Sequence, residues 1–215
     1  STITNLVLPT QGQVVNIPST KQRLETALAS ASAPREAALD STTTWGIFEG
    51  PDAERLGIRD YLGRGDSHFS GSPTNRRKNI ALGAERVDGT LVPPNTEFSM
   101  MGTLGTIDAS GGWLPELVIK GNKTTPEYGG GLCQIGTTAF RGALNVGLPI
   151  TERRNHSYRV RYYEPAGTDA TLYDPSPDFK FKNDTPAHLL ITKDLRKDDV
   201  SFLFWGTKDG RVASS

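Results

Sequence analysis

The sequence contains a single cysteine, Cys133, among 215 residues. One cysteine cannot close an internal disulfide, and it rules out a metal site built from several thiolates. We therefore expect no structural metal, no cofactor, and a fold stabilised by packing. A lone cysteine is by default a small buried hydrophobic residue, so its neighbours must decide whether the thiol reacts.

Net charge and long apolar runs are absent as well. Lys and Arg together number 24, as do Asp and Glu, so no overall field attracts nucleic acid or an anionic membrane. No apolar run approaches the roughly 20 residues that span a bilayer. We expect no nucleic-acid partner and no membrane insertion within this chain, and the oligomeric state is not predicted. The chain starts at Ser1 without a Met, so we expect a piece of a larger protein.

The chain length suits one main domain with a smaller appendage. Residues 1–62 combine loosely alternating segments with one helical pattern, and they predict a small, incomplete α+β unit. Residues 63–72 (GRGDSHFSGS) are polar and rich in turn residues, so they predict a linker. Residues 73–215 then form the main domain.

The second half of the main domain is dominated by short alternating segments separated by Pro, Asp and Gly. Regular short strands of this kind predict a barrel or a sandwich with few helices. We expect an α+β fold in which one central helix starts at a glycine-rich loop. The predicted strands are 158–163, 170–173, 179–182, 189–192 and 200–205.

The glycine-rich loop is Gly129 to Gly131, directly before Leu132 and Cys133. Apolar residues at 135, 139, 143 and 146 predict a helix that ends at Gly147. Cys133 is then at the start of this helix, where unpaired N–H donors and the helix dipole favour a thiolate.

A structural cysteine would not require three preceding glycines, so the pattern favours a nucleophile. We expect the backbone at Gly130 and Gly131 and the side chain of Gln134 to stabilise an oxyanion.

A cysteine nucleophile normally needs a base, and the sequence offers three histidines. We prefer His156, because it lies in a polar stretch between the helix and a predicted strand. His188 enters a strand and His68 lies in the predicted linker. Either Asp169 or Asp178 could orient the imidazole, and either could instead cap its own turn.

A basic patch accompanies the predicted base. Arg153 is suited to holding a substrate carboxylate through two parallel hydrogen bonds, although plain surface solvation explains it as well. We place Tyr158 in the same substrate-binding group. Arg76 and Arg77 are expected to form a solvated face.

Several spaced segments resemble the VanW family over residues 71–210. Residues 9–62 are similar to part of the peptidoglycan-binding region that often precedes a VanW domain. The most specific matches are Asn75-Arg76, Pro94 through Ser99, Gly129 through Gln134, Glu152-Arg153 with His156, Asp169-Ala170 and Asp178-Phe179.

Some VanW-domain proteins are cysteine L,D-transpeptidases, and the resemblance implies an extracytoplasmic protein of the cell envelope that acts on peptidoglycan stem peptides. Cys133 would attack the carbonyl of the third stem residue and release the terminal D-alanine, with His156 as base and Asp169 behind it. An acceptor amine would resolve the thioester into a 3-3 cross-link. The alternatives are a hydrolase, a non-catalytic peptidoglycan-binding module, and a glycopeptide-resistance accessory protein in which Cys133 is simply buried.

Overall fold

The computed structural model describes residues 11–29, 36–45, 51–120 and 123–213. The chain divides into two compact units, Ser1–Ala53 and Glu54–Ser215, which are treated separately below. Within the described residues it is a mixed α/β protein whose paired strands are antiparallel. The elements in chain order are β1 (Gln11–Val15), α1 (Ile17–Ala29), β2 (Ser41–Trp45), α2 (Pro51–Leu56), β3 (Asp60–His68), α3 (Thr74–Val87), β4 (Thr90–Val92), β5 (Glu97–Ser99), α4 (Met100–Leu104), β6 (Pro115–Lys120), β7 (Lys123–Tyr128), α5 (Leu132–Val146), β8 (Ile150–Glu152), the 3-10 helix η1 (Arg161–Tyr163), β9 (Lys180–Lys182), β10 (Leu189–Leu195) and β11 (Asp199–Gly206).

The smaller unit consists of the antiparallel pair β1 and β2 with α1 in the connection between them. The helix begins after Asn16, whose side-chain oxygen accepts a hydrogen bond from the Ser19 N–H at 3.2 Å. The Thr20 hydroxyl accepts a hydrogen bond from the Asp40 N–H at 3.2 Å. This bond ties the first turn of α1 to the segment that enters β2.

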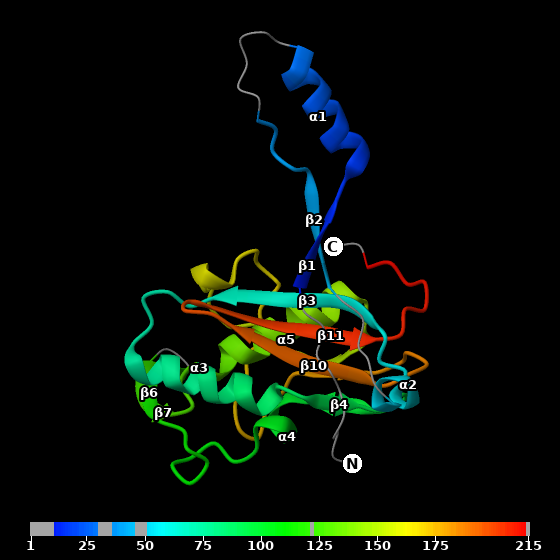
Figure 1. The fold of residues 1–215 in the computed structure, drawn as a ribbon. Helices are drawn as coiled ribbons and strands as arrows, with labels where there is room; N and C mark the ends of the chain where they lie inside the picture. Colours follow the sequence, from blue (N-terminus) through cyan, green and yellow to red (C-terminus); the bar gives the residue numbers. More distant parts are fainter. Residues whose placement is uncertain (1–10, 30–35, 46–50, 121–122, 214–215) are drawn as a thin grey trace. The chain divides into compact units, whose positions relative to one another are not determined.

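The larger unit is built on a four-stranded antiparallel sheet with the strand order β3-β11-β10-β4 (Figure 1). The central strand β11 is buried along its length except for its first residue. Helix α5 packs against β3 and β11, while α3 packs against β10 and α5, so both helices cover the same face. Phe202, Phe204 and Ile191 lie in the core that these helices share with the sheet.

Strand β3 occupies residues that were predicted to be a linker. It pairs with β11 along its whole length, so residues 63–68 belong to the sheet. Their glycines serve close packing, because a Cβ at Gly65 would lie 2.0 Å from Thr138 O and 2.3 Å from Gly142 N. A Cβ at Gly142 would in turn lie 2.3 Å from a ring carbon of Phe204. These glycines allow α5 to lie directly on the backbone of β3.

Two smaller sheets complete the larger unit. Strands β5, β9 and β8 form a three-stranded sheet, and β6 and β7 form a hairpin. Phe98 of β5 and Phe181 of β9 stack with ring centroids 4.8 Å apart, and both belong to the core. The predicted mixture of helices and strands is confirmed. The described strands are divided among four sheets, and the predicted barrel or sandwich is not confirmed.

Helix α5 follows the glycine-rich loop directly. Its N-cap is Gly131, whose φ of 116° lies in a region that glycine adopts without steric cost. The four apolar positions predicted between 135 and 146 are buried. Gly147, with φ of 76°, ends the helix and donates its N–H to carbonyls of the last turn. Helix α5 thus spans these four apolar positions and ends at Gly147.

Residues 158–163 do not form the predicted strand. They form a loop that ends in η1, with Tyr163 buried and with Tyr158 and Tyr162 exposed. The alternation in the sequence therefore does not correspond to alternating burial, since two of its aromatic members are exposed. Residues 170–173 also form no strand. The Leu172 N–H donates to the Cys133 sulfur, and the N–H groups on either side of it donate to the carbonyls of Arg154 and Pro177.

Candidate active site

Cys133 is the second residue of α5, and its side chain is partly buried. Its N–H belongs to the first helical turn, where no earlier helical carbonyl is available as an acceptor. The Leu172 N–H points at the Cys133 sulfur at 3.4 Å, and the Leu172 carbonyl oxygen lies 3.6 Å from the same sulfur. The sulfur therefore lies beside the Leu172 N–H donor at the N-terminal turn of α5.

His156 and Asp169 form a closely linked pair on the chain that follows β8. His156 Nδ1 lies 2.5 Å from Asp169 Oδ2, and the His156 backbone N–H donates to the same oxygen at 2.8 Å. The two side chains are only 12% and 13% exposed. Because the carboxylate accepts, the network assigns the proton to Nδ1 and leaves Nε2 for Cys133.

The ionisation of this pair is shifted toward the charged forms. Burial alone would lower the pKa of His156, but the hydrogen bond and charge of Cys133, and then those of Asp169, outweigh it and raise the pKa. Burial would raise the pKa of Asp169, but hydrogen bonds from His156 lower it. An imidazolium is thus stabilised between a carboxylate and the sulfur.

Arg153 fixes the outer side of Asp169. Its Nη2 lies 3.3 Å from Asp169 Oδ1, and its Nε donates to the Asp169 carbonyl at 2.7 Å. Nη2 also donates to the Gly167 carbonyl at 2.8 Å, and the guanidinium stands 4.7 Å over the Phe140 ring. Arg153 is therefore committed to positioning the carboxylate behind His156.

Tyr163 covers the imidazole of His156. The two ring centroids are 5.2 Å apart at an interplanar angle of 31°, and Tyr163 is 4% exposed. Burial, with the charge of Cys133 as the next cause, raises the pKa of Tyr163 well above its ordinary value. Its hydroxyl is therefore neutral and can donate a hydrogen bond.

Arg141 joins α5 to the loop that follows η1. Its Nη2 donates to the carbonyls of Tyr163 at 2.6 Å and Glu164 at 3.1 Å, and its Nε donates to the Thr168 carbonyl at 3.1 Å. Its Nη1 donates to the Asp66 carbonyl of β3 at 2.9 Å. One side chain thus links the central helix, the sheet and the loop.

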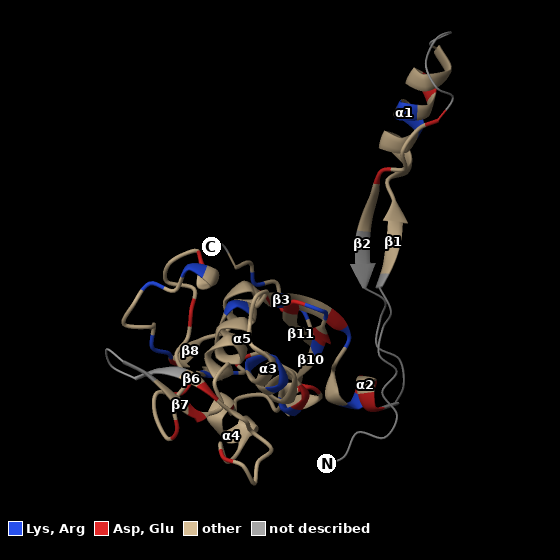
Figure 2. Cartoon of the chain, turned by 90° about the vertical axis from the view of Figure 1, so that its left-hand side faces the viewer, with Lys and Arg blue, Asp and Glu red and all other residues tan. Residues whose placement is uncertain are grey.

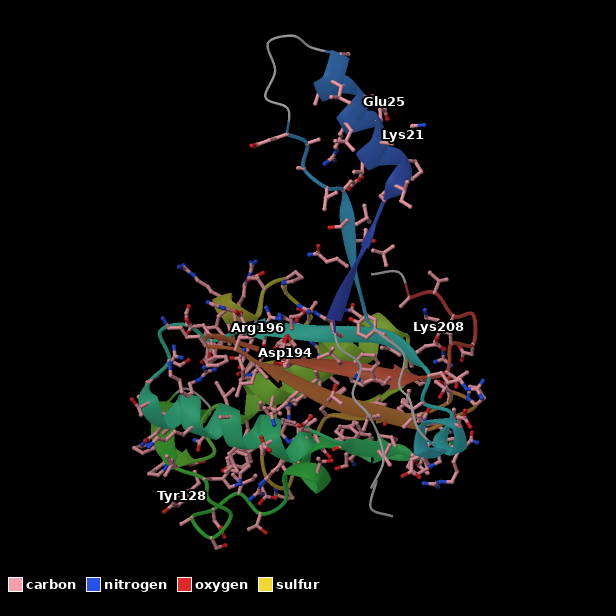
Figure 3. All side chains as sticks on the ribbon, viewed as in Figure 1. Lys21, Glu25, Tyr128, Asp194, Arg196 and Lys208 are labelled. Carbon is pink, nitrogen blue, oxygen red and sulfur yellow. The ribbon has the colours of Figure 1, made fainter. Side chains whose placement is uncertain are left out.

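These groups open into a pocket of about 570 Å³. The N-terminus of α5, the β6–β7 hairpin, and parts of the chain around 156–163 and 171–174 line it. Tyr128, labelled in Figure 3, projects from the end of β7 and is 45% exposed. The other tyrosines in the lining are Tyr162, Tyr163 and Tyr173.

The pocket contains Cys133, His156 and Gly131 from the predicted set, and Asp169 lies behind His156. The other candidate carboxylate, Asp178, instead accepts hydrogen bonds from the Ser99 hydroxyl and the Met101 N–H, at the start of α4. Of the two remaining histidines, His68 pairs with the exposed Asp199, and His188 does not line the pocket.

The remaining predicted site residues lie outside the pocket lining. Gly130 packs against Glu116, and Tyr158 is exposed. Gln134 is fully buried, and its amide is committed on both sides, accepting from Arg76 at 2.9 Å and donating to the His68 carbonyl at 3.3 Å. Arg153, as described above, faces Asp169.

Three contributors to the site were not predicted. Tyr163 was placed in a strand. Leu172 contacts the Cys133 sulfur through its backbone, and such a contact cannot be predicted from the type of residue. Arg76 was expected on a solvated face, yet it lines the pocket. Its spacing from Cys133 in the sequence gave no indication of this, because α3 and α5 come together only in the folded core.

Within the described ranges, no group of three or more His, Cys, Asp or Glu side chains could hold a metal ion. No helix in that part of the chain combines the length and the apolar character needed to cross a membrane. Basic and acidic residues are interspersed over the larger unit in Figure 2, as the balanced composition predicts.

The fold and the site define a mixed α/β domain in which a cysteine, a histidine and an aspartate meet at one pocket. The family model described as VanW like protein matches residues 75–205. The chain therefore belongs to the VanW-like family, and the predicted resemblance is confirmed.

Two relatives are similar over the same region. The uncharacterized protein YoaR of Bacillus subtilis (strain 168) is 34% identical over 147 residues, which cover 67% of this chain and 48% of YoaR. The vancomycin B-type resistance protein VanW of Enterococcus faecalis (strain ATCC 700802 / V583) is 30% identical over 140 residues, which cover 63% of this chain and 46% of that protein. The chain spans about half the length of these curated relatives. No solved structure is significantly similar to it.

Proposed function

We propose that this chain is part of an extracytoplasmic cell-wall enzyme, a cysteine acyltransferase of the L,D-transpeptidase type that acts on peptidoglycan stem peptides. The observation that carries the proposal is the connected series Asp169, His156 and Cys133 at a pocket. Similarity to a protein named for vancomycin resistance supports a cell-wall context.

In the first step the Cys133 thiolate attacks the carbonyl carbon of the scissile amide, and a C–S bond forms. The Cys133 N–H, in the first turn of α5, is a backbone donor that can stabilise the resulting oxyanion. The C–N bond then breaks, and the His156 imidazolium gives its proton to the leaving amine. The products are a thioester on Cys133 and a free C-terminal amino acid.

In the second step an acceptor amine loses a proton to His156 and attacks the thioester. The new C–N bond forms, the C–S bond breaks, and the thiolate returns to its place beside the Leu172 N–H. Water in place of the amine gives the hydrolytic variant, with a free carboxylic acid as the product. Asp169 stabilises the imidazolium in both steps without itself being protonated.

Mass spectrometry after incubation with a disaccharide tetrapeptide tests the proposal. We expect a protein adduct with the mass of the acyl group, free D-alanine, and a cross-linked dimer when an acceptor stem is present. Cys133→Ala should give none of these products. An unchanged product yield from Cys133→Ala would refute acyl transfer at this residue.

A non-catalytic role as a peptidoglycan-binding or resistance accessory module is the second candidate. The exposed tyrosines in the pocket lining favour it, because aromatic rings supply binding area without taking part in chemistry. This candidate predicts that wild-type protein and Cys133→Ala bind the disaccharide tetrapeptide equally well and that neither changes it.

A further inference from the structure

Arg76 is the one lysine or arginine in the lining of the pocket among the described residues. The carboxylates in the lining are those of Glu127 and Asp174, and both repel an anionic ligand group. Arg76 is therefore the long cationic side chain in this lining that can bind an anionic group. Arg153, the residue predicted for that task, is turned toward Asp169.

The guanidinium of Arg76 is held in place by neutral groups. Its Nη1 donates to the Ser72 hydroxyl at 2.5 Å, and its Nη2 donates to Gln134 Oε1 at 2.9 Å. The guanidinium carbon stands 5.3 Å over the ring of Tyr162. In the described part of the chain no carboxylate forms an ion pair with Arg76, so its positive charge is not neutralised there.

Donor capacity remains on this guanidinium. An arginine side chain carries five N–H donors in a planar fork, and the two bonds to Ser72 and Gln134 use only two of them. The same fork is matched to the two oxygens of a carboxylate. Because Arg76 is already oriented by three neighbours, little side-chain entropy is lost when a ligand binds.

Arg76 and Cys133 line the same pocket. Gln134 follows Cys133 directly in α5, and it bonds Arg76, so a single buried side chain separates the guanidinium from the nucleophile's helical turn. Both groups act on the pKa of Tyr163. Burial is the largest cause that raises this pKa, the charge of Cys133 raises it further, and the charge of Arg76 lowers it.

We infer that Arg76 binds the C-terminal carboxylate of the donor peptide, so that the site selects peptides with a free carboxylate on the residue that leaves. The inference rests on the proposed acyl transfer at Cys133. In a leaving amino acid, the carboxylate is separated from the nitrogen of the broken amide by one residue, a length of at most about 3.5 Å. The carboxylate therefore stays within the pocket that Cys133 and Arg76 both line. Gln134 is then a positioning residue for Arg76.

A matched pair of donors tests this selectivity. The disaccharide tetrapeptide with a free carboxylate and its C-terminal amide differ only in the group that Arg76 would bind. For wild-type protein we expect kcat/KM to be about 10- to 100-fold higher for the acid, the usual scale of a charge-assisted hydrogen bond. Arg76→Gln should lower kcat/KM for the acid far more than for the amide, so that the preference between the two donors disappears.

Arg77→Gln is the matched control on the same helix. Arg77 pairs with Asp198 and stacks on Phe69, and it does not line the pocket, so its loss should leave the preference for the acid intact. Arg76→Lys keeps the charge without the fork and should retain part of the preference. The inference is overturned if wild-type protein does not distinguish the two donors, or if Arg76→Gln still prefers the acid.

Binding to the Cys133→Ala protein separates this inference from the proposed function. Calorimetry should give a Kd for the acid about 10-fold or more below that for the amide, and Arg76→Gln in the same background should remove the difference. If this binding preference is found while the wild-type protein forms no adduct, acyl transfer fails and the assignment of Arg76 stands. If neither donor binds better than the other, the assignment fails.

Discussion

One oxygen of Asp169 accepts two hydrogen bonds from the same residue, the Nδ1–H and the backbone N–H of His156. This double contact fixes both the imidazole ring and the chain that carries it. The ring is therefore held in a single orientation, because its rotation would break a bond in a largely buried site.

Asp169→Asn is expected to slow adduct formation by about 10²-fold or more, because an amide at this position no longer favours the Nδ1–H tautomer or the imidazolium. The rate of acylation, followed by intact-protein mass spectrometry, measures this effect. Asp199→Asn is the control, since Asp199 makes a similar 2.7 Å contact with Nδ1 of the exposed His68. Equal effects of the two substitutions would contradict the role of Asp169.

The Cys133 thiol is expected to react with iodoacetamide at pH 7 at least about 10-fold faster than a simple thiol, because His156 can accept its proton as the sulfur attacks. His156→Gln should remove most of this advantage. A wild-type rate equal to that of a model thiol would refute an activated nucleophile, and an unchanged rate in His156→Gln would exclude this histidine as its partner.

The stability contributed by His156 and Asp169 should depend on pH in two directions. The pKa of His156 is raised, so its contribution is complete below about pH 6.5 and is lost as the pH rises through the raised value. The pKa of Asp169 is lowered, so its contribution is complete above about pH 4 and is lost as the pH falls through the lowered value.

Urea denaturation of wild-type protein and His156→Gln from pH 3 to 9 checks this pattern. We expect the difference in unfolding free energy to be greatest between about pH 4 and 6.5 and to shrink on both sides. Removing the thiol in Cys133→Ala should move the upper limb to lower pH, because Cys133 is the main cause that raises the pKa of His156. A difference that does not change with pH would rule out this coupling.

Gly65→Ala is expected to destabilise the protein by about 3 kcal/mol or to prevent folding, because the added methyl would overlap the backbone of α5. The urea midpoint measures the loss. Gly63→Ala, in the same strand, would crowd a Val146 methyl at 3.0 Å and meet the Asn145 backbone at an ordinary contact distance of 3.7 Å, so it should cost less, about 1 kcal/mol. Equal costs at the two positions would show that strand propensity, not the contact with α5, sets the requirement for glycine.

The sequence was informative where local rules act alone. The stripe of apolar residues in α5, its glycine stop and the position of Cys133 in its first turn follow from helical periodicity and from the preference of glycine for positive φ. His156 was chosen from three candidates because of its polar surroundings, and the structure places it in the pocket with Cys133.

Long-range packing limited the rest. Glycine is common in linkers, and nothing in the sequence near β3 indicates that an α-helix lies against Gly63 and Gly65. Arg153 and Gln134 were predicted to bind substrate because of their chemistry. In the structure Arg153 forms an ion pair with Asp169, and the buried Gln134 accepts a hydrogen bond from Arg76. Arg76 is distant from Cys133 in sequence, so its place in the pocket depends on how α3 packs against α5.

The hydrogen bonds of Arg141 give α5 a second role besides carrying Cys133. Cys133 and Arg141 are about two turns apart on the same helix, and the arginine holds the carbonyls of Tyr163 and Thr168. The number of residues between them is therefore a constraint in its own right. Inserting one residue there would rotate Arg141 by about 100° relative to Cys133. Such a protein would keep all of these side chains and still lose the alignment between Cys133 and the segment that Arg141 holds.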